Sequence, residues 1–161
     1  MAYAIRPFRP EDAAALADLT LQAIGAVGSH SYSEEQVDAW AARHPGPERF
    51  LQRHAGGAHI CVAAETGDCP VAYALLEPDG HLDMLYCHPD HTRRGIADRL
   101  LDEAERIARS LNIDRLYTEA SELARAAFER AGYVVQHRRD FEIEGVAIHN
   151  FAMEKLLTPA G

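Results

Sequence analysis

Two arginines and a glycine stand at the start of a long helical pattern, and their types and order suit the binding of an anion. Arg93, Arg94 and Gly95 come directly before a stretch in which apolar residues recur at steps of 4, 4, 3 and 4. The first N–H groups of a helix have no partner within it, and the helix dipole adds positive charge there. Glycine lets an anion approach the backbone, and arginine suits phosphate oxygens. The segment therefore predicts a phosphate or pyrophosphate site, although a surface turn with solvated arginines would show the same residues.

Other phosphate-binding and metal-binding motifs are absent from the sequence. It has no Gly-x4-Gly-Lys-Ser/Thr loop for ATP and no Gly-x-Gly-x-x-Gly turn for NAD. Residues 87–91 (Cys-His-Pro-Asp-His) include ligand types for zinc, but no second pair of ligands stands at a matching spacing. No metal site is therefore expected.

The elements that would position this segment follow from apolar spacing and turn signals. Strands are expected at 2–8, 59–65, 71–77, 82–87, 115–119, 133–142 and 146–155. Helices are expected to begin at 10–12, at the capping box 33–36, at 95–96 and at Ser121. The residues Pro45-Gly46-Pro47 stop the second helix, and Glu144-Gly145 turns the last hairpin. The order β-α-α-β-β-β-α-β-α-β-β predicts an α/β fold, an α+β mixed sheet with helices on its faces, in one domain of residues 1–161.

Composition narrows the class of protein. The chain of 161 residues has 47% hydrophobic and 25% charged residues, as in ordinary globular proteins. Its net charge of -9 argues against a general nucleic-acid binder. The negative charge would attract cationic substrates such as amines, although solubility alone explains it equally well. No apolar run approaches the ~20 residues of a membrane span, and the N-terminus does not resemble a secretory signal. Three widely spaced cysteines favour a reducing, cytoplasmic location over a disulfide framework.

The anion segment and its surroundings resemble motif A of the GNAT N-acetyltransferase family. In that motif a strand and a turn lead to Gln/Arg-x-x-Gly-x-Gly/Ala at a helix start; here the strand is 82–87 and the core is 92–97 (Thr-Arg-Arg-Gly-Ile-Ala). Residues 121–133 resemble the family's Asn-x-x-Ala-x-x-Leu-Tyr-Glu-Lys-x-Gly-Phe segment. Four segments, 30–40, 82–97, 128–133 and 150–155, further resemble the YafP-like branch of the family. The resemblance implies the GNAT acyl-CoA N-acyltransferase fold from Ile5 to Lys155.

The resemblance also implies a cofactor, acetyl-CoA, as the acetyl donor. Its pyrophosphate would lie on the N–H groups of residues 93–97, and its pantetheine arm would run along strand 82–87 like an added strand. The thioester would enter a gap between that strand and 115–119, with a backbone N–H near Leu85 holding the oxyanion. The cofactor-binding residues implied in this way are Leu85, Tyr86, Cys87, Thr92, Arg93, Arg94, Gly95, Ile96, Ala97, Ser121 and Phe128.

Two positions depart from the family pattern. Thr92 replaces the usual Gln or Arg, and binding should survive because backbone N–H groups do most of the phosphate work. Phe128 stands where many members carry the tyrosine that protonates the leaving thiolate. A thiol of pKa ~8.5 leaves fairly well without help, and Tyr86 or Tyr117 could substitute. The change leaves open a non-catalytic acyl-CoA sensor or interaction module.

Two carboxylates are candidates for the general base. Asp83 interrupts an apolar strand, which is costly unless the carboxylate is paired or working, and it aligns with the glutamate base of many family members. Glu119, at the end of the next strand, is the second candidate. A base is needed because an amine of pKa ~10.4 is only about one part in ~10³ neutral at pH 7. A purely structural, salt-bridged Asp83 is the alternative.

The acceptor would bind where the family fold places its acceptor pocket. The candidate substrate residues are His30, Tyr32, Trp40 and Asn150. His30 and Tyr32 could equally be structural, and Trp40, on an apolar stripe, is more typical of a core residue. We expect an N-acetyltransferase acting by direct attack of a small-molecule amine, without nucleic acid or membrane as partner. A protein-amine acetyltransferase remains an alternative, and a homodimer is left open.

Overall fold

The computed structural model describes residues 3–28, 31–43 and 46–157. Within these ranges, no helix is both long and apolar enough to cross a membrane. The strands are β1 (Ala4–Pro7), β2 (His59–Glu65), β3 (Cys69–Leu76), β4 (Leu82–Cys87), β5 (Arg115–Ala120), β6 (Val134–Ile143) and β7 (Val146–Leu156). The helices are α1 (Ala13–Gly28), α2 (Glu34–Ala41), α3 (Pro47–Ala55), α4 (Ile96–Ser110) and α5 (Arg125–Arg130).

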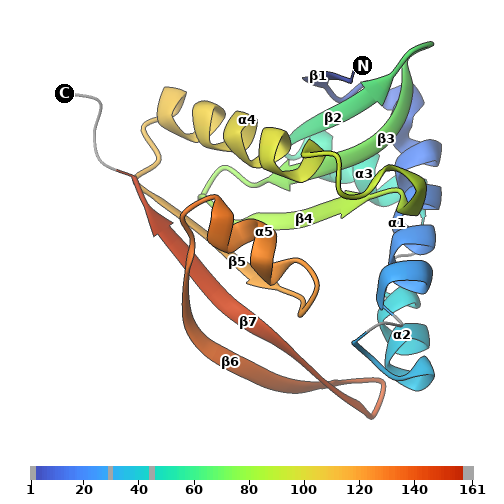
Figure 1. The fold of residues 1–161 in the computed structure, drawn as a ribbon. Coiled ribbons are helices and arrows are strands. Elements are labelled where there is room, and N and C mark those ends of the chain that lie inside the picture. Colours follow the sequence, from blue (N-terminus) through green and yellow to red (C-terminus); the bar gives the residue numbers. More distant parts are fainter. Residues whose placement is uncertain (1–2, 29–30, 44–45, 158–161) are drawn as a thin grey trace.

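The strands form two antiparallel sheets that diverge from each other (Figure 1). The first has the order β1-β2-β3-β4, and the second has the order β5-β7-β6. The expected meander of residues 59–87 and the final hairpin are both present, with register pairs such as Tyr73 with Tyr86 and Ile143 with Val146. The mixed α/β character expected from the sequence is confirmed.

The two sheets meet where β4 begins, beside the middle of β5. A parallel bridge joins His81 to Tyr117, and the Thr118 hydroxyl donates to the Leu82 carbonyl at 2.7 Å. Beyond these contacts β4 and β5 belong to separate sheets, and the ribbon shows them moving apart (Figure 1). This is the expected gap between the strands at 82–87 and 115–119.

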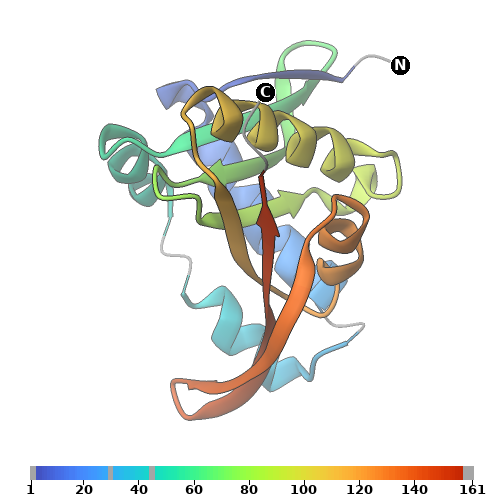
Figure 2. The same cartoon turned by 90° about the vertical axis from the view of Figure 1, so that its left-hand side faces the viewer.

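Helices cover both faces of the first sheet. Leu16 of α1 and Phe50 of α3 pack with Tyr73 on one face, while Leu100 of α4 packs with Ala72 on the other. The β6–β7 hairpin extends past α2, as the turned view shows (Figure 2). The hairpin and α2 therefore enclose the space beyond the ends of β4 and β5.

Two expectations about helices need correction. The segment after Pro45-Gly46-Pro47 contains an unpredicted helix, α3, because Pro47 occupies a first-turn position, where its fixed φ and missing N–H are tolerated. The helix expected directly after Ser121 begins only at Arg125. The Ser121 hydroxyl accepts the Ala124 N–H at 3.2 Å, which stabilises a turn before α5.

A register shift in β4 changes the direction of one side chain. Leu75 lies opposite Met84 but Leu76 lies opposite Leu82, so Asp83 has no opposite residue in β3. Such bulges re-aim side chains. Asp83 contacts Arg53 of α3, so its side chain lies on the same face of the sheet as Met84. In a strand without a bulge, side chains alternate between the faces, and Asp83 would lie on the α4 face.

Candidate active site

The turn before α4 has the geometry of an anion site. Gly95 is the N-cap residue of α4 and has a positive φ of 76°, while Arg93 has a φ of 64°. A Cβ at position 95 would meet no atom within 4 Å, so the space beside this backbone is open. Ile96 is buried in the core that α4 shares with the first sheet, which anchors the start of this helix.

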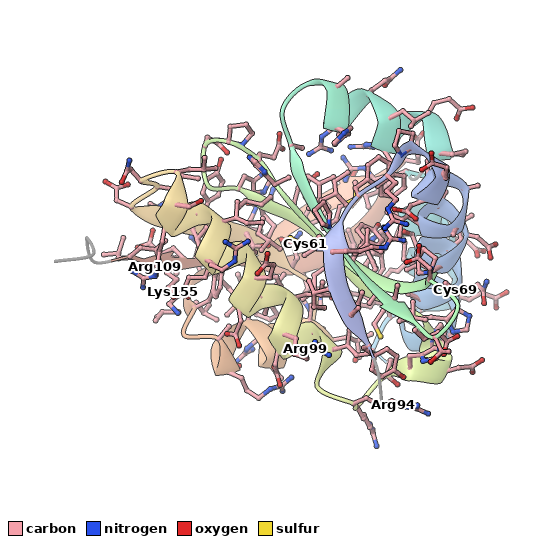
Figure 3. The ribbon with its side chains drawn as sticks, turned by 90° about the horizontal axis from the view of Figure 1, so that it is seen from above. Cys61, Cys69, Arg94, Arg99, Arg109 and Lys155 are labelled. Carbon is pink, nitrogen blue, oxygen red and sulfur yellow. The ribbon has the colours of Figure 1, made fainter. Side chains whose placement is uncertain are left out.

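The arginines of this turn lie at the surface beside the N-terminal strand. Arg94 donates to the Tyr3 hydroxyl at 3.0 Å, and Arg99 donates to the Tyr3 carbonyl at 3.0 Å. Figure 3 shows Arg94 before α4 and Arg99 further along it, with Arg109 and Lys155 at the opposite end of the helix. Two guanidinium groups thus lie near the N-terminal end of α4, where the helix dipole already favours an anion.

A narrow cavity of about 150 Å³ leads from this turn along β4. Thr92 and Ala97 line it at the α4 end, Leu85 and Cys87 line it along β4, and Ser121 lines it opposite. Its walls are mainly apolar side chains, which suits a flexible chain such as pantetheine.

The backbone of β4 offers hydrogen-bonding groups to this cavity. The His88 N–H donates to the Val71 carbonyl at 2.8 Å, so His88 and Val71 form a hydrogen-bonded pair. Such pairs alternate along an antiparallel ladder. Tyr86 therefore bonds to β3, and the backbone groups of Leu85 and Cys87 point away from β3, toward the gap.

A larger cavity of about 420 Å³ lies beside the first. Both cavities share residues, including Trp40, Leu85, Tyr86 and Ser121. Nine residues predicted from the sequence line the larger one: Tyr32, Trp40, Asp83, Leu85, Tyr86, Glu119, Ser121, Phe128 and Asn150. Four of the predicted residues lie outside both linings, in the anion turn: Arg93, Arg94, Gly95 and Ile96. His30 lies outside the described residues.

Aromatic side chains form one wall of the larger cavity. The Trp40 indole N–H donates to the Tyr86 hydroxyl at 3.2 Å, and the Trp40 ring packs against Tyr32 at 5.6 Å between centroids. The Tyr32 hydroxyl accepts the Glu122 N–H at 2.8 Å and donates to the His149 carbonyl at 3.2 Å. Tyr32 thus connects the start of α2 to β7, in addition to lining the cavity.

Asp83 lies in an ion-pair cluster with helix α3. Its Oδ2 is 2.8 Å from Arg53 Nη2, and the same nitrogen lies 2.7 Å from Glu77 Oε1. Asp83 is therefore both salt-bridged, as in the structural alternative, and in contact with the cavity, as expected of a base. Its assignment as the base stays a prediction.

Glu119 is paired with a histidine that the sequence analysis did not single out. His81 Nε2 lies 2.7 Å from Glu119 Oε1, and the imidazole stacks on Tyr117 with centroids 4.6 Å apart. Burial disfavours the charged imidazole, but the hydrogen bond to Glu119 and the charges of Glu119, Asp83 and Glu77 outweigh this and raise the pKa of His81. No signal in the sequence brings positions 81 and 119 together; the β4–β5 junction does.

Two tyrosines that could replace the missing acid differ in position. Tyr86 lines both cavities, and burial raises its pKa. Tyr117 lies outside both linings, and its hydroxyl donates to Asp79 at 2.5 Å, which raises its pKa to about 12. Phe128 is buried, lines the larger cavity and packs edge-on against Tyr133 at 5.0 Å.

One group of metal-ligand types is also present near this site. Within the described ranges, Glu77, His81 and Asp83 bring one ligand atom each to within 4.8 Å of one another. The Arg53 guanidinium contacts two of them and supplies the positive charge that a cation would bring.

Comparisons with known proteins agree with this architecture. Residues 29–155 match the family model described as an acetyltransferase (GNAT) domain. The chain belongs to the GNAT acetyltransferase family. The expected class of enzyme, an acetyl-CoA-dependent acetyltransferase, is therefore confirmed.

Particular relatives span nearly the whole chain. It is 30% identical to the uncharacterized N-acetyltransferase YafP of Escherichia coli K12, over 92% of this chain and 93% of that protein. A Rhodopseudomonas palustris structure, titled "GCN5-Related N-acetyltransferase: Aminotransferase, Class-II", is 36% identical, with a TM-score of 0.88 over 98% of this chain and 97% of that one. The PaiA N-acetyltransferase of Thermoplasma acidophilum, solved with coenzyme A, has a TM-score of 0.78 over 97% and 99% of the two chains; at 21% identity it shows the fold alone.

Proposed function

We propose that this protein transfers the acetyl group of acetyl-CoA to an amine of a small molecule. The observation that carries the proposal is the continuity of three features: the anion turn at Gly95, the narrow cavity along β4, and the larger cavity between β4 and β5. A pyrophosphate, a pantetheine arm and an acceptor would occupy them in that order. We further propose that residues 1–161 act as one domain.

The cofactor is held mainly by backbone groups in this proposal. The N–H groups at the start of α4 would hold the pyrophosphate, and the backbone groups of Leu85 and Cys87 would pair with the pantetheine arm. The Leu85 N–H points away from β3, toward the gap into which the thioester would enter, which supports its role at the oxyanion.

The size and walls of the larger cavity support a small acceptor. Its volume of about 420 Å³ falls within the ~300–1,000 Å³ usual for small-molecule sites. Side chains from α2 and the β6–β7 hairpin line it, including Trp40 and Asn150. A protein lysine would have to enter past these elements, so a small amine fits better.

In the reaction that we propose, the amine nitrogen attacks the thioester carbonyl and a carbon–nitrogen bond forms. The carbon–sulfur bond then breaks and releases the CoA thiolate, which takes a proton from solvent. The thiolate needs no dedicated acid, because a thiol pKa of ~8.5 makes it a fair leaving group. Phe128 therefore does not exclude turnover.

The pair of Glu119 and His81 is the base that we favour. Glu119 lines the cavity and can accept the ammonium proton, and His81 can share it across their 2.7 Å contact. The pair can take up a proton while His81 is neutral. A base with a pKa near the working pH is the most effective, and the raised pKa of His81 supports this role. Asp83 already contacts the Arg53 guanidinium at 2.8 Å, which is a reason to place it second.

An amine screen with acetyl-CoA tests the function, with release of free CoA thiol as the readout. We expect amine-dependent release that requires the folded wild-type protein. The change at Phe128 supports one competitor, a sensor that binds acyl-CoA without turnover. The sensor would be favoured if calorimetry shows tight acetyl-CoA binding while no amine in the screen causes thiol release.

The place of action that we propose is the reducing cytoplasm. Cys61, Cys69 and Cys87 are all free thiols. Burial raises the pKa of Cys87 to about 11, which keeps this thiol protonated beside the cofactor cavity.

A further inference from the structure

We infer that the acceptor is an amine that also carries a carboxylate, and that the positive charges of Arg49 and Arg139 hold this carboxylate in the larger cavity. The inference rests on the proposed function and names its substrate class. An α-amino acid is the simplest compound of this kind. A carboxylate on the acceptor was not expected from the sequence, because the net charge of -9 favours cationic ligands at the surface.

Most arginines of this acidic chain are already paired. Nine of them lie within 4.0 Å of a carboxylate: Arg6, Arg9, Arg53, Arg106, Arg109, Arg115, Arg125, Arg130 and Arg138. Among the described residues, six have no such partner: Arg43, Arg49, Arg93, Arg94, Arg99 and Arg139. Three of these six lie at or near the anion turn, where a phosphate ligand is expected, and the other three line the larger cavity. An arginine without a carboxylate partner favours an anionic ligand, so we infer an anion both at the anion turn and in the larger cavity.

Arg49 comes from helix α3 and is half-buried. Its Nη1 donates to the Arg43 carbonyl at 3.2 Å, a neutral partner that leaves the charge uncompensated. Its charge reaches the Tyr86 hydroxyl, since it partly opposes the rise that burial causes in the pKa of Tyr86. Arg53, one turn further along α3, is the contrast, because Glu77 and Asp83 both neutralise it.

Arg139 comes from β6, in the other sheet, and is also half-buried. Its Nη1 donates to the Asn150 side-chain carbonyl at 3.0 Å, and its guanidinium lies over the Phe141 ring at 5.2 Å. These contacts fix the plane of the guanidinium without neutralising it. A planar, oriented guanidinium suits a carboxylate, which it can bind through two parallel hydrogen bonds.

The acids of the cavity do not cancel this positive charge. Asp83 is bound to Arg53, and Glu119 is bound to His81. Glu142 also lines the cavity but is exposed. The cavity thus holds Glu119, the proposed proton acceptor of the amine, together with guanidinium groups that can receive an anion. An amine that carries a carboxylate matches both.

The test compares L-amino acids with their carboxamides as acceptors, because the carboxamide removes the negative charge and keeps the rest of the molecule. We expect kcat/KM to favour the acids by about tenfold or more, even though the amides have less basic and therefore more reactive amines. Arg49→Gln and Arg139→Gln should each remove most of this preference, because each should raise KM for the acid. For the amide, kcat/KM should change less than about twofold in both variants. Arg138→Gln is the matched control, because Arg138 is an exposed neighbour that pairs with Asp140 and lies outside the cavity lining.

The outcomes separate this inference from the proposed function. If amides or diamines are acetylated better than the acids, or if neither cavity variant changes the preference, the substrate class is wrong while the acetyltransferase function stands. If no amine is turned over, the proposed function fails. Calorimetric titration of the same amino acids into the CoA-saturated protein then decides the inference, because absence of binding, or equal binding of acids and amides, would overturn it.

Discussion

His81 Nε2 lies 2.7 Å from Glu119 Oε1, across the point where the two sheets of this protein meet. The pair lies at the start of the gap between β4 and β5, and Glu119 lines the cavity in which the acceptor is proposed to bind. A proton accepted at Glu119 can therefore be shared with an imidazole that three carboxylates surround.

Glu119→Gln should lower kcat about 100-fold at neutral pH, since a positioned base contributes ~10²–10⁴-fold. His81→Asn should lower it less, because Glu119 remains. In the wild type, kcat should rise with pH as the pair loses its proton, with a midpoint above the usual histidine pKa of ~6.5. The measurement is kcat against pH for all three proteins. An unchanged acid limb in His81→Asn would remove His81 from the account.

The same pair should leave a signature in stability. The pKa of His81 is raised in the folded state, so its contribution to stability is fully present below pH ~6.5 and is lost as pH rises through the folded pKa. The free energy of unfolding should therefore differ between wild type and His81→Asn more at about pH 6 than at about pH 9. Urea titrations at both pH values measure this, and an equal difference at both would contradict the raised pKa.

Asp83→Asn tests the carboxylate that the sequence favoured as the base. If Asp83 only orients the cluster, the variant should retain most of the wild-type kcat at pH 7, because Arg53 keeps Glu77 as a partner. If Asp83 is the base, kcat should fall about 100-fold and recover partly at high pH, where more amine is neutral. Acetyl-CoA affinity is the control and should not change, since the cofactor contacts are mainly backbone.

Gly95→Glu should abolish acetyl-CoA binding in a folded protein. The added carboxylate would enter the open space beside the start of α4 and repel the pyrophosphate. The positive φ of Gly95 adds strain for any side chain, so Gly95→Asn is the control, because asparagine tolerates this conformation. Calorimetry should show weakened binding in Gly95→Asn and none in Gly95→Glu. Equal affinity in both variants would end the assignment of the anion site.

Phe128→Ala should weaken acetyl-CoA binding and leave the shape of the pH profile unchanged, because the ring lines the cavity but cannot transfer a proton. It should also lower the free energy of unfolding by about 3–5 kcal/mol, as is usual for a buried phenylalanine. Binding must therefore be measured at a temperature where the variant is folded. Loss of a basic limb with unchanged affinity would contradict this role.

The parts of the site that the sequence predicted are those encoded locally. Gly95 and the helical pattern after it follow from residues close together in the chain, and so does the capping box at Ser33, whose hydroxyl accepts the Gln36 N–H at 3.1 Å. The alternating apolar strands likewise predicted the meander and the hairpin.

The parts that were missed depend on tertiary contacts. The bulge that turns Asp83 toward Arg53 requires the register of β3 against β4, and the pairing of His81 with Glu119 requires the β4–β5 junction. Helix α3 was missed because Pro47 was interpreted as a stop when it is a first-turn residue. Because α3 was not predicted, neither the placement of Arg49 at the cavity nor the contact of Arg53 with Asp83 could be predicted.

The central claim is that an acetyl group passes directly from acetyl-CoA to a small amine in the cavity between β4 and β5. Mass spectrometry of the amine panel after incubation with acetyl-CoA labelled with ¹³C in the acetyl group tests it most directly. We expect an N-acetylated small molecule that carries the label, formed by the wild type and absent with Gly95→Glu. Labelled acetate alone, or no labelled amine beside a protein that binds acetyl-CoA tightly, would contradict it.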